Sequence, residues 1–129
     1  MDSEGKPRIL VIEDNGRIRR LVVKVLEFAG YVADQAADGE KGMRLARQRS
    51  HELVVLDLAL PSQDGWSVLD EMKSDPALRE TPVLIFTAFA DQSERQRATA
   101  RGAAGFITKP VGAVELNNAI RGILAGKVI

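Results

Sequence analysis

The sequence of 129 residues contains no cysteine. This absence excludes disulfide scaffolds, thiolate zinc sites and cysteine nucleophiles. The chain also lacks an excess of either charge, because 18 Lys and Arg residues balance 18 Asp and Glu residues. A balanced charge predicts neither a nucleic acid nor a membrane surface as the partner of this domain. Any electrostatic function must therefore be local.

Long apolar segments are absent as well. The longest uncharged apolar runs, such as Leu53–Leu56 and Val83–Phe86, are far shorter than the roughly 20 residues that span a bilayer. The polar N-terminus lacks the apolar core of a signal peptide, and the chain contains no repeat, low-complexity stretch or Pro- or Gly-rich linker. We therefore expect one cytoplasmic domain over residues 1–129, with a core at about residues 7–126 and no output domain in this chain.

Short apolar runs alternate along the chain with longer segments of helical periodicity. Continuous runs without polar alternation are typical of parallel strands that are covered on both faces. Such runs occur at Ile9–Ile12, Leu53–Leu56 and Val83–Phe86. Two weaker strands are expected at Tyr31–Ala36 and Ala104–Ile107, where the alternation requires them.

Five helices are expected between and after these strands. They are predicted at Ile18–Ala29 before Gly30, at Gly39–Gln48 with Asp38 as its N-cap, at Ser67–Ser74, at Asp91–Arg101, and after Pro110. The buried face of the first helix is expected to include Leu21, and that of the last helix to include Val114. The segment Asp91–Arg101 has only two apolar residues and should be loosely held. Five βα units of this size predict an α/β fold, a doubly wound parallel sheet with flanking helices.

Polar residues stand at the ends of four predicted strands. Glu13 and Asp14 follow the first strand, Asp57 the third, Thr87 the fourth and Lys109 the fifth. The carboxyl ends of parallel strands meet at one edge of a sheet, so these side chains should converge. Three converging carboxylates repel one another unless a cation joins them, and oxygen ligands suit a hard divalent ion. We therefore expect Mg²⁺ at this edge.

Each of these residues also has an ordinary structural interpretation. A lone Asp at a strand end is usually a helix cap, and Glu13-Asp14 before Asn15-Gly16 fits a turn. Thr87 fits a β-branched strand residue, and Lys109 an exposed charge. The combination at one edge is harder to explain by packing. It suits phosphoryl transfer onto a carboxylate, with Asp57 as nucleophile, Lys109 as a second positive charge, and Thr87 as a hydrogen-bond donor to the phosphoryl group.

The sequence resembles the receiver domain of two-component response regulators, the family typified by the chemotaxis response regulator, over nearly its whole length. The matching segments are Ile9–Asn15, Val54–Asp57, Pro61 with Asp64-Gly65, Ile85–Ala88 and Gly105–Pro110. The resemblance implies a flavodoxin-like (βα)5 fold with strand order 2-1-3-4-5. It also implies that Asp57 accepts a phosphoryl group from a histidine kinase or a histidine phosphotransfer protein.

The resemblance further implies a ligand set and a switch. Asp14, Asp57 and the backbone carbonyl of Ala59 would bind Mg²⁺, with Glu13 contributing through water. Thr87 and Phe106 would form the switch pair, although an aromatic residue on a strand is more ordinarily part of the core. The change would propagate to the surface formed by the fourth helix, the fifth strand and the fifth helix. That surface would control a downstream protein or drive dimerisation.

Two further features follow from the resemblance, and a third from the charged residues themselves. The Lys109-Pro110 bond is typically cis in this family. Ala59 and Phe89 occupy positions that tune phosphoryl lifetime in the family, and both are apolar here. Neither can position a water by hydrogen bonding, so we predict slow self-dephosphorylation. A basic helix face is ordinarily a solvated surface, and its functional alternative is docking on a kinase or phosphotransfer helix; it comprises Arg17, Arg19, Arg20 and Lys24.

Three rival functions fit the sequence less well. A phosphatase with an aspartyl intermediate commonly carries a second Asp two residues after the nucleophile, where this chain has Ala59. A flavin- or nucleotide-binding module is disfavoured by the absence of glycine-rich phosphate-binding motifs. A receiver-like interaction module that is never phosphorylated is opposed by the complete acid, hydroxyl and lysine set. The domain also fits a segment of a longer DNA-binding regulator or hybrid kinase.

Overall fold

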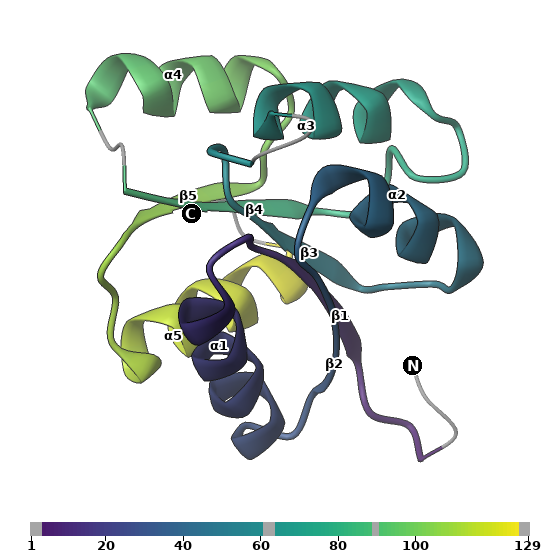
Figure 1. Ribbon diagram of the computed structural model, residues 1–129, viewed down its shortest axis with the longest axis vertical. Helices are drawn as coiled ribbons and strands as arrows, with labels where there is room; N and C mark the ends of the chain where they lie inside the picture. The colour runs from purple at the N-terminus through teal and green to yellow at the C-terminus, as the bar shows by residue number, and fades with distance from the viewer. Residues whose placement is uncertain (1–3, 61–63, 89–90, 127–129) are drawn as a thin grey trace.

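The computed structural model describes residues 4–60, 64–88 and 91–126, and within them five parallel strands form one sheet flanked by helices (Figure 1). The strands are β1 (Arg8–Ile12), β2 (Val32–Ala36), β3 (Leu53–Leu56), β4 (Val83–Thr87) and β5 (Gly105–Thr108). Their spatial order is β2-β1-β3-β4-β5, and every neighbouring pair is parallel. The predicted flavodoxin-like fold and strand order are confirmed.

The helices cover both faces of the sheet. They are α1 (Gly16–Phe28), α2 (Gly39–Gln48), α3 (Gly65–Ser74), α4 (Gln92–Ala100) and α5 (Ala113–Leu124). Figure 1 shows α1 and α5 together on one face, and α2, α3 and α4 on the other. Two apolar cores result, one on each side of the sheet. Among the described helices, none is long and apolar enough to cross a bilayer.

The strands β1, β3 and β4 lack polar alternation because both of their faces are covered. In β1, Leu10 and Ile12 pack into the core beneath α2, α3 and α4, whereas Ile9 and Val11 pack into the core beneath α1 and α5. Successive strand residues point to opposite faces, so a strand between two helical layers needs apolar residues at every position. This physical requirement is the reason that the continuous apolar runs predicted these strands correctly.

Side-chain caps fix where four helices begin. Asn15, Asp38, Asp64 and Asp91 each accept a hydrogen bond from the backbone N–H three residues later, at 2.8 to 3.0 Å. Such caps satisfy an N–H that has no partner inside the helix. The predicted Asp38 cap is confirmed. The cap at Asp64 starts α3 at Gly65, two residues earlier than the sequence periodicity indicated.

Two apolar side chains predicted to be buried lie on the surface. Leu21 of α1 is 61% exposed and Val114 of α5 is 75% exposed. The buried face of α5 begins at Leu116, and a helix turns about 100° per residue, so a residue two positions earlier points almost to the opposite side. Leu21 likewise lies outside the buried stripe of α1, on the side of Phe28, which is 97% exposed. The apolar periodicity overestimated the width of both buried faces.

The helix α4 buries little apolar surface, as its composition predicted. Ala98 is its one buried residue and Ala100 is exposed. Polar contacts to α3 supplement this small core. The guanidinium groups of Arg97 and Arg101 lie 4.2 and 5.1 Å from the centre of the Trp66 ring, and Arg101 Nη1 lies 3.1 Å from Asp70 Oδ2. Charged side chains therefore contribute much of the attachment of α4 to α3.

Candidate functional site

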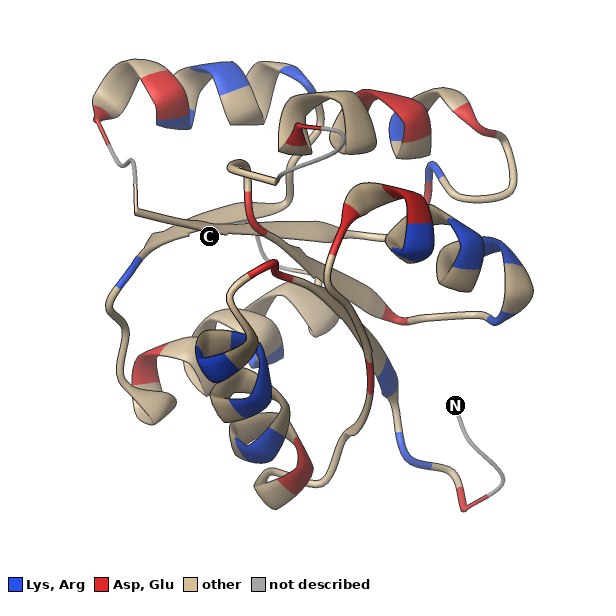
Figure 2. Cartoon of the chain, viewed as in Figure 1, with Lys and Arg blue, Asp and Glu red and all other residues tan. Residues whose placement is uncertain are grey.

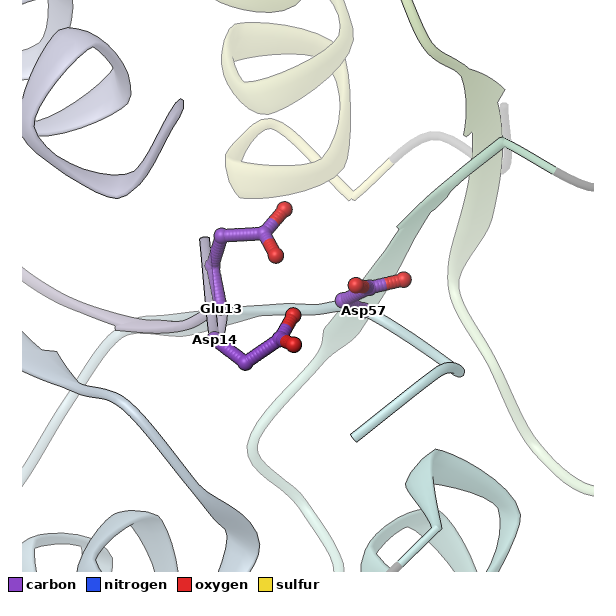
Figure 3. Close-up of side chains that lie close together, drawn as sticks. All are labelled: Glu13, Asp14 and Asp57. Atoms are coloured by element: carbon purple, nitrogen blue, oxygen red, sulfur yellow. The ribbon is translucent and has the colours of Figure 1, made fainter. Parts of the chain in front are cut away.

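Three carboxylates converge where β1 and β3 end. Glu13 and Asp14 directly follow β1, and Asp57 directly follows β3. One oxygen atom from each lies within 4.8 Å of the others (Figure 3). Glu13 and Asp57 are only 1% and 4% exposed, whereas Asp14 is open to solvent. The predicted convergence of these three acids at one sheet edge is present in the structure.

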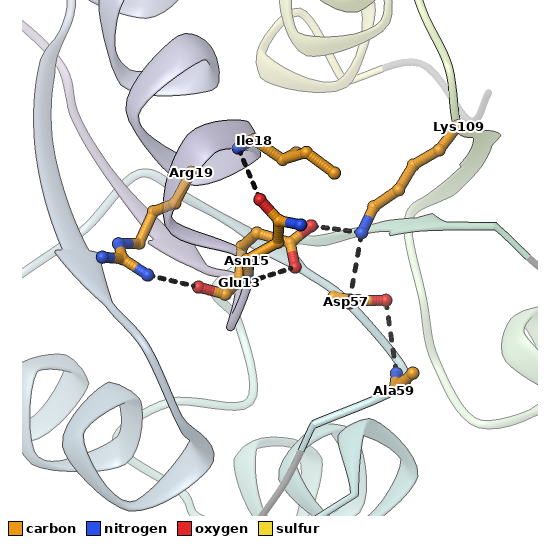
Figure 4. Close-up of polar contacts among 7 residues, drawn as sticks. All are labelled: Glu13, Asn15, Ile18, Arg19, Asp57, Ala59 and Lys109. Carbon is orange, nitrogen blue, oxygen red and sulfur yellow. Dashed lines mark hydrogen bonds and ion pairs between the residues drawn. The ribbon is translucent and has the colours of Figure 1, made fainter.

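Lys109 brings a positive charge to the buried acids. It directly follows β5, and its Nζ donates to Asp57 Oδ2 at 3.2 Å (Figure 4). The same Nζ forms an ion pair with Glu13 Oε1. The lysine side chain is 14% exposed, so solvent screens these contacts weakly. The Lys109-Pro110 peptide bond is cis, as the family resemblance implied.

The two oxygens of Asp57 have different partners. Oδ2 faces the ammonium group of Lys109, and Oδ1 accepts a hydrogen bond from the backbone N–H of Ala59 at 3.2 Å. The peptide N–H of Asp57 itself donates to the carbonyl oxygen of Ile12 at 3.0 Å. A buried carboxylate requires such compensation. These contacts hold Asp57 in one place beside the other two acids.

Glu13 has an unusual protonation equilibrium. Its pKa is raised from 4.5 to about 7, because burial and the negative charge of Asp57 together outweigh the opposing contact with Lys109. Its other oxygen, Oε2, accepts from the backbone N–H of Asn15 at 3.3 Å. The site is therefore short of positive charge when all three acids are ionised. A divalent cation would relieve this deficit.

The residues of the predicted switch lie on β4 and β5. Thr87 is the last residue of β4, where its side chain is fully buried and its backbone pairs with Thr108. Phe106 pairs with Ile85 and is 6% exposed, within the core beneath α2, α3 and α4. The aromatic ring therefore belongs to the core, which was the ordinary interpretation of this residue. Phe89 and Pro61 lie outside the described residues.

Two contacts near the acids were not assigned to the site from the sequence. Arg19 was placed on a basic helix face, yet its Nη1 donates to the backbone carbonyl of Glu13 at 2.9 Å. Gly65 approaches the chain so closely that a Cβ atom there would lie 2.4 Å from the carbonyl oxygen of Asp57. The Asp64-Gly65 pair in the sequence was the available signal for that approach. The pattern of residues in the sequence does not distinguish Arg19 from the other basic residues of α1.

The sequence matches the family model of the response regulator receiver domain over residues 9–121. The chain belongs to this family. Receiver domains are signalling modules of two-component systems, and phosphoaspartate and Mg²⁺ are typical of them. The acidic cluster at the ends of β1 and β3 is thus the pocket in which receiver domains generally bind Mg²⁺. The carboxylate oxygens of Glu13, Asp14 and Asp57 are of the kind that this ion prefers as ligands.

Curated relatives of this receiver domain are transcriptional regulators. RpaA of Synechocystis, a DNA-binding dual master transcriptional regulator, is 39% identical over 118 residues, which are 92% of this chain and 49% of that protein. The transcriptional activator IrlR of Burkholderia pseudomallei is 37% identical over 117 residues, or 91% and 50% of the two chains. This receiver domain spans about half the length of these relatives.

Solved receiver structures share the fold closely. The CheY-like receiver domain protein of Methanospirillum hungatei has a TM-score of 0.87 and 26% identity, and the match covers 95% of this chain and 96% of that one. The chemotaxis protein CheY4 of Vibrio cholerae has a TM-score of 0.86 and 25% identity, covering 91% and 98%.

Proposed function

We propose that Asp57 accepts a phosphoryl group from a histidine kinase or a histidine phosphotransfer protein. The observation that carries this proposal is the environment of Asp57, which is 4% exposed, contacts Lys109 and Ala59, and adjoins two further acids. A carboxylate oxygen of Asp57 attacks the phosphorus atom, and the bond from phosphorus to the donor nitrogen breaks. The electron pair of that bond leaves with the donor imidazole.

The residues around Asp57 would each stabilise the negative charge of the phosphoryl group in a different way. Glu13, Asp14, Asp57 and the backbone carbonyl of Ala59 would hold Mg²⁺, which supplies positive charge to the phosphoryl oxygens when bound. Lys109 already lies at hydrogen-bonding distance from Asp57 Oδ2, so its ammonium group is placed to offset the added phosphoryl charge. Thr87, at the end of the neighbouring strand, would donate its hydroxyl hydrogen to the phosphoryl group.

The signal would leave through α4, β5 and α5. Thr87 and Phe106 lie on the paired strands β4 and β5, so a movement of the threonine hydroxyl can reach the aromatic ring through their shared backbone ladder. The sparse core of α4 supports this route, since an element with few buried contacts can shift at low energetic cost. The outputs we propose are binding of a downstream protein and dimerisation on phosphorylation.

The phosphoryl donor would dock on α1. Figure 2 shows that positive residues follow one another along this helix, and Arg17, Arg20 and Lys24 are exposed. Beside them runs an apolar groove of about 500 Å³ between α1 and the segment after β5. Its lining includes Leu21, Pro110 and the active-site Lys109. A kinase or phosphotransfer helix with apolar and acidic side chains fits a groove that leads to the acceptor site.

The named relatives favour one particular output. Both RpaA and IrlR are transcriptional regulators of which this domain covers about half. We therefore propose gene regulation as the process that this receiver domain controls, through contact with a DNA-binding segment of the same or another chain.

Sedimentation of the domain with and without beryllofluoride tests the proposed dimerisation on phosphorylation. A shift from monomer to dimer supports it, and an unchanged monomer at high protein concentration contradicts it.

Chemical trapping tests the acceptor assignment at residue resolution. Borohydride reduces an acyl phosphate on aspartate to homoserine, and peptide mass spectrometry then locates the reduced residue. After incubation with acetyl phosphate and Mg²⁺, we expect reduction at Asp57 and no reduction at Glu13 or Asp14. Reduction at another acid, or none at all, would contradict the proposed acceptor.

A further inference from the structure

One side chain of α4 contacts β5 at three points. Arg95 Nη1 donates to the backbone carbonyl of Phe106 at 3.1 Å, and Nη2 donates to Thr108 Oγ1 at 3.2 Å. Its guanidinium carbon also lies 4.9 Å from the centre of the Phe106 ring. Among the described strands, β5 pairs with β4 alone, so it is an edge of the sheet, and the Arg95 side chain reaches it from α4. Edge strands carry backbone groups that need such partners.

The three contacts span the segment between the aromatic ring and the active-site lysine. Phe106 pairs with Ile85, Thr108 pairs with Thr87, and Lys109 follows at once and contacts Asp57. A rigid displacement of this segment would move the ring and the ammonium group together. Among the described side chains of α4, Arg95 is the one that donates hydrogen bonds to β5. It therefore couples the position of α4 to that segment.

The chemistry of these contacts requires an arginine. The planar guanidinium group offers several N–H donors in a fixed fork and can stack its face on an aromatic ring. It donates hydrogen bonds to a carbonyl oxygen and a hydroxyl oxygen and contacts the face of a ring at the same time. A lysine ammonium at the same position carries the same charge as a single compact group, and cannot satisfy the three contacts together.

We propose that Arg95 is a positioning residue that holds Phe106 buried and β5 in place in the unphosphorylated protein. It sets the resting balance of the switch, because an outward movement of the ring requires the loss of its contacts. The link to signalling rests on the proposed phosphoryl-receiver function, whereas the effect on Phe106 and β5 does not.

The test compares Arg95→Gln, Arg95→Lys and wild type, each labelled with fluorophenylalanine. Arg95 is exposed, so neither substitution removes a buried side chain. Fluorine NMR reports the environment of each of the four phenylalanines, and Phe106→Leu identifies the resonance of Phe106. Arg121→Gln is the matched control, because it removes an exposed arginine of the same charge from α5.

In unphosphorylated protein, both Arg95 variants should shift the Phe106 resonance towards its solvent-exposed position. Amide exchange in β5 should accelerate about tenfold in both, since a local contact that restrains opening has been lost. Arg121→Gln should change neither observable. A buried Phe106 ring and unchanged β5 exchange in Arg95→Gln would overturn the proposal, and so would full retention of both by Arg95→Lys.

A second arm separates this inference from the receiver function. Beryllofluoride and Mg²⁺ mimic the phosphoryl group, and they should return the Phe106 resonance of Arg95→Gln to that of the equally treated wild type. A persistent difference would contradict a role in the switch balance. If wild-type protein fails to respond to beryllofluoride at all, the receiver function is refuted, while the comparison of unphosphorylated variants still decides the role of Arg95.

Discussion

Asp57 combines burial, a positive neighbour and two acidic neighbours within one small volume. The ammonium group of Lys109 contacts one of its oxygens and the N–H of Ala59 contacts the other. At the scale of single residues, this arrangement orients the acceptor, while three acids share a single lysine. Burial and the neighbouring charge of Asp57 raise the pKa of Glu13. The chemistry of the site is therefore connected to the stability of the metal-free protein.

Ionisation of Glu13 should lower the free energy of unfolding as the pH rises. Its pKa in the folded protein is about 7, above the ordinary 4.5, so the folded state binds more protons than the unfolded state between these values. The free energy of unfolding should therefore fall as the pH increases through this window, by up to about 3 kcal/mol, and then level off. Glu13→Gln removes this slope.

Urea denaturation in chelator at pH 5 and pH 8 measures the difference. The variant should gain stability relative to wild type at pH 8 but little at pH 5. Adding Mg²⁺ at pH 8 should restore stability to wild type, because a ligand that binds only the folded state stabilises it. Equal pH slopes for the two proteins would show that Glu13 does not titrate in this way.

Ala59 should control how long the phosphoryl group persists. Its exposed methyl group lies next to Asp57 in space, since its own N–H contacts that carboxylate. A methyl group cannot orient an attacking water, whereas an amide side chain can. Ala59→Asn should therefore shorten the lifetime of phosphorylated protein about tenfold, measured as decay of the phosphorylated mass after removal of the donor. Ala59→Val is the apolar control and should retain the lifetime; a longer lifetime in Ala59→Asn would contradict the account.

At the scale of elements, α4 depends on charged contacts for its attachment. Arg97 and Arg101 stack on Trp66 of α3, and Arg101 also pairs with Asp70. Cation–π and exposed ion-pair contacts each contribute about 0.5 to 1 kcal/mol. Replacing both arginines by glutamine should therefore accelerate amide exchange in α4 about tenfold, with exchange in β4 unchanged.

The control for this experiment is Arg79→Gln, which removes an exposed arginine whose neighbour is Glu80. It should leave α4 exchange at the wild-type rate. Raising the salt concentration should accelerate α4 exchange in wild type more than in the double variant, because screening weakens the contacts that the variant already lacks. Unchanged α4 exchange in the double variant would place its attachment in the Ala98 core and the Arg95 contacts instead.

The elements themselves were largely predictable from the sequence. Strands covered on both faces must be apolar throughout, so β1, β3 and β4 produced unmistakable runs. The site acids and Lys109 were predictable because parallel strands deliver their carboxyl ends to one edge. The exposure of Leu21 and Val114 was not predictable, because periodicity gives the direction of a buried helix face but not its width. The contacts of Arg95 depend on the spacing of two elements, which no local pattern encodes.

At the scale of the whole molecule, the acceptor site and the groove beside α1 share Lys109. The groove also contains Leu21, whose side chain is 61% exposed, so its loss costs little packing. Leu21→Ser should therefore slow phosphotransfer from a histidine phosphotransfer protein at least about tenfold in kcat/KM, while phosphorylation by acetyl phosphate stays unchanged.

Val114→Ser is the matched control for the groove, because Val114 is a comparably exposed apolar residue on α5. The rate of phosphotransfer to wild type and to both variants is measured by stopped flow or quench flow. The same donor protein, one that phosphorylates wild type, is used for all three. Val114→Ser should retain the wild-type rate. Equal slowing by both substitutions would show that general surface polarity, and not the groove, determines the rate.

The most direct test of the central claim is the intact mass of the protein after incubation with acetyl phosphate, with and without Mg²⁺, beside Asp57→Asn. The account predicts the gain of one phosphoryl group by wild type, dependent on Mg²⁺, and no gain by the variant. Equal phosphorylation of Asp57→Asn, or no gain by wild type with any small donor, would contradict the assignment of Asp57 as the acceptor.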